Sequence, residues 1–291
     1  MRKLGIVITV LLLVAVLGLM LASVGVISLP LPKHTPMQRT SVLPFTSKLQ
    51  ETSGYTAEIR PRLVVDTPVG SIEVRSAEVE QLEITMVAEA GAGSAERAQQ
   101  LLAGISLDVT TTKNATKLVV QLPKVEAQEE AKADLIILVP GTIDLELRSG
   151  LGDIQVNQVQ GNVQVHTHLG TITVQDCQGS AHLETALGDI RVTGSSFTDR
   201  LTAITHLGDL QISATLAASN VLETRLGDLR LHLLPDEAYV LDGKLDLGGI
   251  YLAVPFTGEQ SEKSVKGIVG RGEQRGSISA RLALGSLRIT N

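Results

Sequence analysis

The sequence predicts an all-β protein, a parallel β-helix or solenoid with coils of 18–20 residues, from a repeated motif and from the composition. The pattern Leu-Gly-x-Ile/Leu-x-apolar recurs with its glycines at Gly152, Gly170, Gly188, Gly208, Gly227, Gly248 and Gly285. The steps between these glycines are 18, 18, 20, 19, 21 and 37 residues, and the last is close to two periods with one corner hidden. A nearly constant step of this size is typical of stacked coils.

The columns of the repeat predict which side chains face the interior. Apolar residues lie two and four positions after each glycine, and the alternation places both on one face of a strand. The chain has no Trp, three Tyr and three Phe, although 43% of its residues are hydrophobic, so the interior must consist of Val, Ile, Leu and Ala. Leucine and glycine are expected to shape each corner. An antiparallel sandwich remains an alternative packing of the same strands.

The N-terminus predicts a single-pass membrane anchor in residues 1–29. Residues 4–29 form an uncharged run after Arg2 and Lys3, and a helix of this length exceeds the hydrocarbon core of a bilayer. We expect a single-pass protein of the cell membrane with a cytoplasmic N-terminus and an extracytoplasmic bulk, and a cleaved signal peptide is the alternative. Residues 30–51, rich in proline, are expected to be a linker.

Residues 52–147 predict a β-rich cap on the solenoid, and residues 148–291 predict the repeat itself. A first corner is expected in residues 67–74, and Ser94 is expected to cap a short amphipathic helix that extends to Ile105. Strands are expected at residues 81–88, 106–111, 116–122 and 133–139. The cap would protect the edge of the first coil.

This order of elements resembles the bacterial putative-adhesin family, a β-strand-repeat domain of unknown function with a bactofilin-like or head-GIN-like β-helix. The matching segments are residues 70–74, 94–105, 135–140, the series from Gly152, and Gly270-Arg-Gly-Glu followed by residues 277–290. The chain departs from the family pattern in having Leu where Ser often precedes the glycine. The resemblance implies a fold and a place in the cell envelope more than it implies an activity.

The aspartates of the corner are expected to be structural. They form one outward column of Asp153, Asp189, Asp209 and Asp228. A carboxylate next to a turn glycine can accept backbone N–H groups at the corner. Weak cation binding by the column, with calcium as the natural candidate, is the alternative.

Two other groups of residues are candidate sites with simpler explanations. His166, His168 and Glu184 share an outward face and are the metal candidates, although an ordinary solvated face explains them without a metal. Cys177 aligns with Val159 of the previous coil, which predicts a buried side chain and slow labelling by thiol reagents.

The overall chemistry predicts a non-enzymatic module with no cofactor. A net charge of −6 without basic clusters argues against nucleic acid. No nucleotide-binding glycine motif or Ser-His-Asp signature is evident, so no catalytic residue is assigned. We expect an adhesin-like, envelope-interaction or stress-related module that contacts an envelope protein or polymer. One alternative is a scaffold that self-associates end to end, because the chain stops one residue after its last strand and leaves little to cover that coil, unless residues 258–276 fold over it. The other alternative is a carbohydrate-active β-helix enzyme.

Overall fold

The computed structural model describes residues 47–291, which belong to one compact unit. The expected anchor (residues 4–29) and most of the expected linker lie outside the described residues. Among residues 47–291, no helix is long and apolar enough to cross a membrane.

The described chain is almost entirely β-structure, with one helix, α2 (Ala95–Ala103). The strands before the repeat are β1 (Ser47–Ala57), β2 (Arg62–Val69), β3 (Ile72–Ser76), β4 (Leu82–Ala92), β5 (Ser106–Thr111), β6 (Ala115–Gln121) and β7 (Glu130–Val139). The first coils contain β8 (Asp144–Leu151), β9 (Ile154–Asn157), β10 (Gln160–Leu169), β11 (Ile172–Gln175), β12 (Gln178–Leu187) and β13 (Ile190–Leu207). The remaining strands are β14 (Leu210–Thr215), β15 (Ser219–Leu226), β16 (Leu229–His232), β17 (Glu237–Leu252), β18 (Phe256–Gln260), β19 (Ser264–Gly270) and β20 (Glu273–Thr290).

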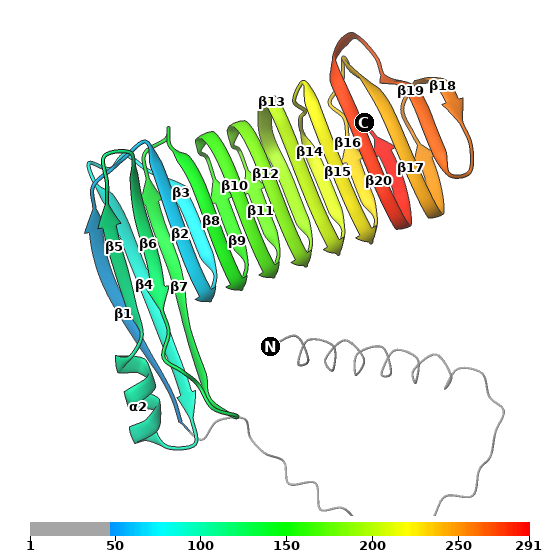
Figure 1. Cartoon of the computed structure of the whole chain (residues 1–291). Coiled ribbons are helices and arrows are strands. Elements are labelled where there is room, and N and C mark those ends of the chain that lie inside the picture. Colours follow the sequence, from blue (N-terminus) through cyan, green and yellow to red (C-terminus); the bar gives the residue numbers. More distant parts are fainter. Residues whose placement is uncertain (1–46) are drawn as a thin grey trace, which may run out of the picture. The chain divides into compact units, whose positions relative to one another are not determined.

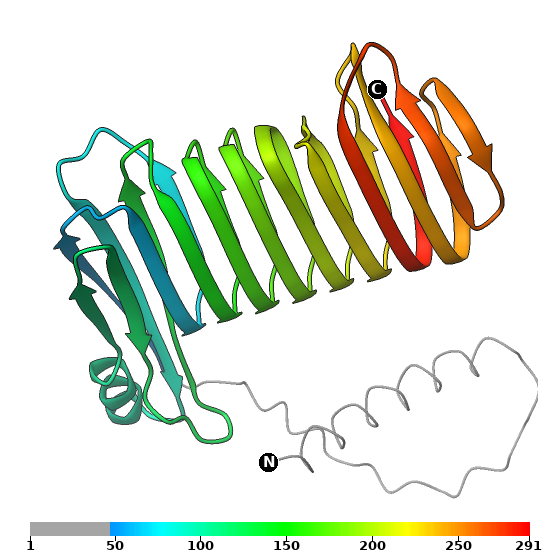
Figure 2. The same ribbon diagram turned by 45° about the horizontal axis from the view of Figure 1, so that its top comes forward.

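The strands stack into two sheets that form opposite walls of a rod (Figures 1 and 2). Sheet I has the order β5-β6-β2-β8-β10-β12-β13-β15-β20-β17-β19-β18. Sheet II has the order β1-β4-β7-β3-β9-β11-β13-β14-β16-β20-β17. The long strands β13, β17 and β20 cross a corner and belong to both sheets.

Neighbouring coils pair in parallel and in register, which confirms the solenoid and excludes the antiparallel sandwich for the repeat. Ile172 lies between Ile154 and Ile190, one coil to either side. The steps of 18 to 20 residues therefore return the chain to the same column. This is the geometry in which identical small apolar side chains stack efficiently.

The order of the last coils differs from the order in the sequence. Strand β20 lies between the coil of β15 and β16 and the strand β17, so Gly285 stacks on Gly227 and Gly248 stacks on Gly285. The expected hidden corner between Gly248 and Gly285 does not exist, because β18 and β19 form an antiparallel hairpin there. Strand β19 pairs with β17 and extends sheet I beyond the last coil. The C-terminal strand is therefore interior rather than an exposed end.

The N-terminal portion contains the first coil as well as the cap. Strands β2 and β3 meet at Gly70 and stack on β8 and β9, while β6 and β7 pair with their other edges. Strand β1 begins at Ser47, so residues 47–51 belong to sheet II and not to the expected linker. Helix α2 begins as predicted, with the Ser94 hydroxyl accepting from the Arg97 N–H.

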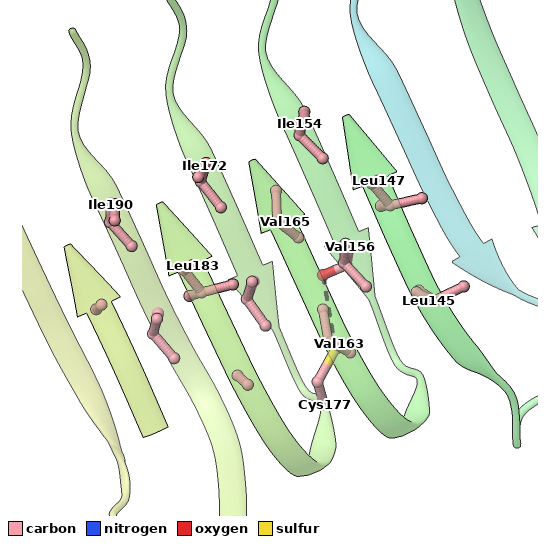
Figure 3. Close-up of a cluster of buried hydrophobic side chains, with 14 of the residues drawn as sticks. Leu145, Leu147, Ile154, Val156, Val163, Val165, Ile172, Cys177, Leu183 and Ile190 are labelled. Carbon is pink, nitrogen blue, oxygen red and sulfur yellow. Dashed lines mark hydrogen bonds between the residues drawn. The ribbon is translucent and has the colours of Figure 1, made fainter. Parts of the chain in front are cut away.

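The interior between the sheets is filled by the predicted columns. Leu147, Val165 and Leu183 from sheet I meet Ile154 and Ile172 from sheet II, all at 0–1% exposure (Figure 3). The inner space contains branched aliphatic side chains in close contact, and their burial is the main favourable contribution to folding. Recognition of a partner must therefore use the outer faces, the corners or the ends.

Candidate functional site

The corner glycines hold a conformation that other residues rarely adopt. At Gly170 φ is +154°, and a Cβ there would collide with the carbonyl oxygen of Gly152 in the preceding coil. The same collision recurs at each stacked corner glycine. Glycine is required both by the backbone angle and by the close approach of consecutive coils.

The corner aspartates bind the next coil rather than their own turn. Asp153 Oδ1 accepts the Thr171 N–H of the next coil at 2.7 Å, and the equivalent bond recurs at the three other aspartates of the column. The other donors are the N–H groups of Asp209 to Asp189, of Asp228 to Asp209, and of Ser286 to Asp228, at 2.8–2.9 Å. The aspartates therefore accept backbone N–H groups at the corner, as predicted, but the N–H belongs to the next coil. Each carboxylate links two levels of the rod.

Hydroxyl side chains make a second set of bonds between coils that the sequence analysis missed. Thr167 Oγ1 donates to the Gly152 carbonyl at 3.1 Å, and Ser149 donates to Gly70 at 2.9 Å. Thr185, Thr205 and Thr224 repeat the contact with Gly170, Gly188 and Gly208. The sequence does contain a signal for these bonds, because the inward column has Ser or Thr in each of the five coils from Ser149 to Thr224, in an otherwise aliphatic interior.

Arginines two residues after the corner neutralise three of the four aspartates in the column. Arg230 reaches Asp209 and Asp228, each at 2.7 Å, and Arg191 pairs with Asp189. Partial burial acts to raise the pKa of Asp209, but the Asp228 N–H and the Arg230 guanidinium outweigh it and lower that pKa. Within residues 47–291, no group of three or more His, Cys, Asp or Glu is placed to hold a metal ion.

The metal candidates are only partly brought together. His166 and Glu184 lie in register on adjacent coils of sheet I, with His166 Nδ1 3.6 Å from Glu184 Oε2. The second imidazole near this carboxylate is that of His182, at 3.8 Å, which the sequence analysis did not consider. His168 instead meets His166 edge to face, with ring centroids 5.0 Å apart. The three predicted residues thus share a face without forming a ligand set.

Cys177 lies in the interior at the opposite corner of the coil. Its side chain is 1% exposed, and its thiol donates to the carbonyl of Val156 at 3.7 Å (Figure 3). Burial raises the pKa of this thiol. A buried, protonated thiol is a poor nucleophile, which agrees with the expected slow labelling.

The corner leucines, which were expected to shape the coil together with the glycines, are exposed. Their side chains are 41–61% exposed and follow one another along one long edge of the rod, where the arrowheads of β8, β10 and β12 lie (Figure 1). The leucine ridge, as we call this row, consists of Leu151, Leu169, Leu187, Leu207, Leu226, Leu284 and Leu247 in spatial order. Contiguous apolar surface of this kind is uncommon on monomeric proteins, so the leucine ridge is a candidate contact surface.

The fold and the corner bonding define a two-walled parallel β-solenoid. The model of the Toastrack DUF4097 family matches residues 61–280, so the chain belongs to that family. This agrees with the resemblance that the sequence suggested. A search of curated proteins finds no match.

Several solved structures are similar to this chain at low sequence identity. A putative adhesin from Bacteroides fragilis is 14% identical with a TM-score of 0.48, over 84% of this chain and 98% of its own. A putative cell adhesion protein from Clostridium sporogenes is 10% identical with a TM-score of 0.41, over 82% and 99%. A putative lipid binding protein from Parabacteroides distasonis is 10% identical with a TM-score of 0.37, over 83% and 97%.

Proposed function

We propose that this protein is a membrane-anchored, extracytoplasmic, non-enzymatic module that binds an envelope partner through the outside of its solenoid. The uncharged run of residues 4–29 supports the anchor. The tightly filled interior supports an external binding surface, because it leaves no space for a ligand between the sheets.

The observation that carries this proposal is the leucine ridge. Leu207 is 49% exposed and Leu226 is 46% exposed. The fold does not require an apolar side chain at such an exposed corner position, because a polar residue would fit it as well. An apolar row along the whole length of the repeat suits adhesion-like contact with a protein or polymer surface.

Photo-crosslinking in cells tests the proposed contact. Benzoylphenylalanine replaces Leu207 in the full chain, and the matched control replaces Gln175, which is exposed at the opposite corner. We expect a covalent adduct after irradiation from position 207 and none from position 175, with mass spectrometry identifying the captured partner. Equal capture from both positions, or none from either, would contradict the ridge as the contact surface.

Protease protection tests the proposed location. Protease added outside intact spheroplasts is expected to digest residues 47–291 while a cytoplasmic marker stays whole. Protection of the solenoid until the membrane is lysed would exclude an extracytoplasmic module.

End-to-end assembly is a second candidate, favoured by one edge of sheet II. Among the described residues, the segment Leu247–Leu252 pairs with β20 on one side, and on the other its only hydrogen bond comes from the Gln260 side chain to the Ile250 carbonyl. An unpaired edge can accept a strand of another molecule. We expect Ile250→Pro, which removes an outward N–H, to abolish any polymer seen by light scattering. A monomeric wild-type chain at high concentration would exclude this candidate.

A further inference from the structure

A column of long side chains on the outer face of sheet II contains three arginines, and the last of these has a different environment from the other two. The column runs, in register, through Arg191, Gln211, Arg230, Arg288 and Tyr251. It lies two residues beyond the corner, on β13, β14, β16, β20 and β17. The strands that contain its last two members, β20 and β17, lie side by side near the C-terminal end of the rod (Figure 1).

The first two arginines of this column are neutralised, and Arg288 is not. Arg191 and Arg230 each follow a corner aspartate by two residues and pair with it. In the coil of Arg288 the corner residue is Ser286, which has no charge. Within residues 47–291, Arg288 forms no ion pair with a carboxylate.

The nearest corner carboxylate is already occupied by other groups. Asp228 Oδ1 accepts the Ser286 N–H at 2.9 Å, and its Oδ2 accepts Arg230 at 2.7 Å. Arg288 instead lies over the Tyr251 ring, with 5.6 Å between the guanidinium carbon and the ring centroid. Such stacking orients the guanidinium without using its N–H donors.

Arg288 borders a shallow hollow that contains further donors and no carboxylate. Two apolar residues contribute to the lining, and its polar residues are Gln211, Ser213, Arg230, His232, Arg288 and Thr290. His232 Nδ1 lies 3.2 Å from Thr290 Oγ1, so the imidazole and the hydroxyl are held together at the edge of the hollow. Of the two guanidinium groups at this hollow, that of Arg230 is already paired with Asp209 and Asp228, so Arg288 supplies the charge that has no carboxylate partner among the described residues.

We infer that this hollow binds an oxyanion, a phosphate or carboxylate group carried by an anionic envelope polymer. A guanidinium binds either group through two parallel N–H bonds, and hydroxyl and amide groups complete the contact. The oxyanion site follows from the geometry alone. Only the polymer as its source rests on the proposed envelope function.

Titration calorimetry of the full chain in detergent at low ionic strength tests the site. The probes are polyphosphate and polygalacturonate, which separate phosphate from carboxylate, and neutral dextran. We expect at least one polyanion to bind and dextran not to bind. Arg288→Gln is expected to weaken that binding at least about tenfold. Arg288→Lys retains the charge without the planar guanidinium, so its affinity is expected to lie between those of the wild type and the Gln variant.

The matched control is Arg191→Gln, on the same face but paired with Asp189, and we expect it to change affinity less than about twofold. Equal losses in the Arg191 and Arg288 variants would indicate general attraction of polyanions and overturn the site. So would affinity that is unchanged in Arg288→Gln, or binding of neither polyanion. These outcomes are independent of crosslinking at Leu207, so either proposal can fail without the other.

Discussion

The two corners of each coil tolerate change very differently. At the Leu-Gly corner the levels from Gly70 to Gly285 have the same glycine geometry, and each is bonded to the next through an Asp, Ser or Thr side chain. At the opposite corner the backbone varies, with left-handed conformations at Gln158, Asp176 and Gly194. There the register between β12 and β13 shifts between Gly179 and Ala181, where the 20-residue step accommodates its extra residues.

The difference shows where a solenoid can absorb insertions. An extra residue at the Leu-Gly corner would break bonds to two neighbouring coils at once, because each corner is both donor and acceptor. An extra residue at the opposite corner bulges outward and leaves the columns aligned. The opposite corner is instead stabilised by individual contacts, such as those of the buried Asn220.

The largest expected effect is at the regular corner. Gly188→Ala places a Cβ against the Gly170 carbonyl at a φ of +150°, and we expect a loss of about 3 kcal/mol or more in unfolding free energy. Gly194→Asn, at the opposite corner where φ is +62°, is expected to cost about 1 kcal/mol or less. Asn tolerates this backbone region, and the Asp176 carboxylate that the new Cβ would meet is the end of an exposed side chain that can turn away. Urea unfolding measures both, and similar losses would refute the contrast.

A smaller loss is expected from an individual contact at the opposite corner. Asn220 accepts the Ala217 N–H and donates to the carbonyls of Ala217 and Ser277. Asn220→Ala leaves these buried groups unsatisfied and is expected to cost about 2–3 kcal/mol. Asn220→Asp retains only the acceptor function and serves as the comparison. A loss below about 0.5 kcal/mol in the Ala variant would show that this corner needs no specific bonds.

Acid is expected to weaken the regular corner through Asp209. Its pKa is lowered in the folded state from 3.8, so its contribution is present above that value and is lost as pH falls through the lower folded pKa. Between about pH 4 and pH 2, Asp209→Asn is expected to lose less unfolding free energy than the wild type does. The difference is expected to be less than about 1 kcal/mol, because the carboxylate is partly exposed. Thermal unfolding across this range tests the sign, and a steeper acid loss in the variant would reverse it.

The smallest expected effect is on the leucine ridge. Leu207→Gln changes an exposed side chain, and we expect a change within about 0.5 kcal/mol. The fully buried Leu210, three residues later, is the control, and Leu210→Ala is expected to cost about 2–5 kcal/mol. If thermal scans show that both variants lose stability equally, the ridge leucines serve the fold rather than a partner.

Much of the fold could be predicted because its signals are local. The period of the Leu-Gly motif, the inward columns and helix α2 with its Ser94 cap each depend on a short segment. The exposure of the leucines could not be predicted by alternation. Leu169 has the same parity as the inward Thr167, but the chain turns at Gly170 and the side chain lies on the edge instead.

The candidate sites divide in the same way. His166 and Glu184 were correctly placed on adjacent coils, because a fixed period defines their register. Arg288 was not recognised, because its environment depends on which coil lies beside β20. In the order predicted from the sequence, residues 284–290 lie at the end of the rod, where Arg288 would have other neighbours.

The sequence by itself determined the coil, with its glycine corner, aliphatic interior and parallel stacking, because these follow from side-chain size and backbone conformation within one period. Only the tertiary structure decided the order of the last coils, the bonding of each Asp to the next level and the exposure of the leucine ridge. The corners at Gly227, Gly248 and Gly285 are nearly equivalent in sequence, so local preference does not distinguish their order. The choice depends on long-range pairing, in which the hairpin of β18 and β19 extends sheet I beyond β17 and β20 pairs on both sides.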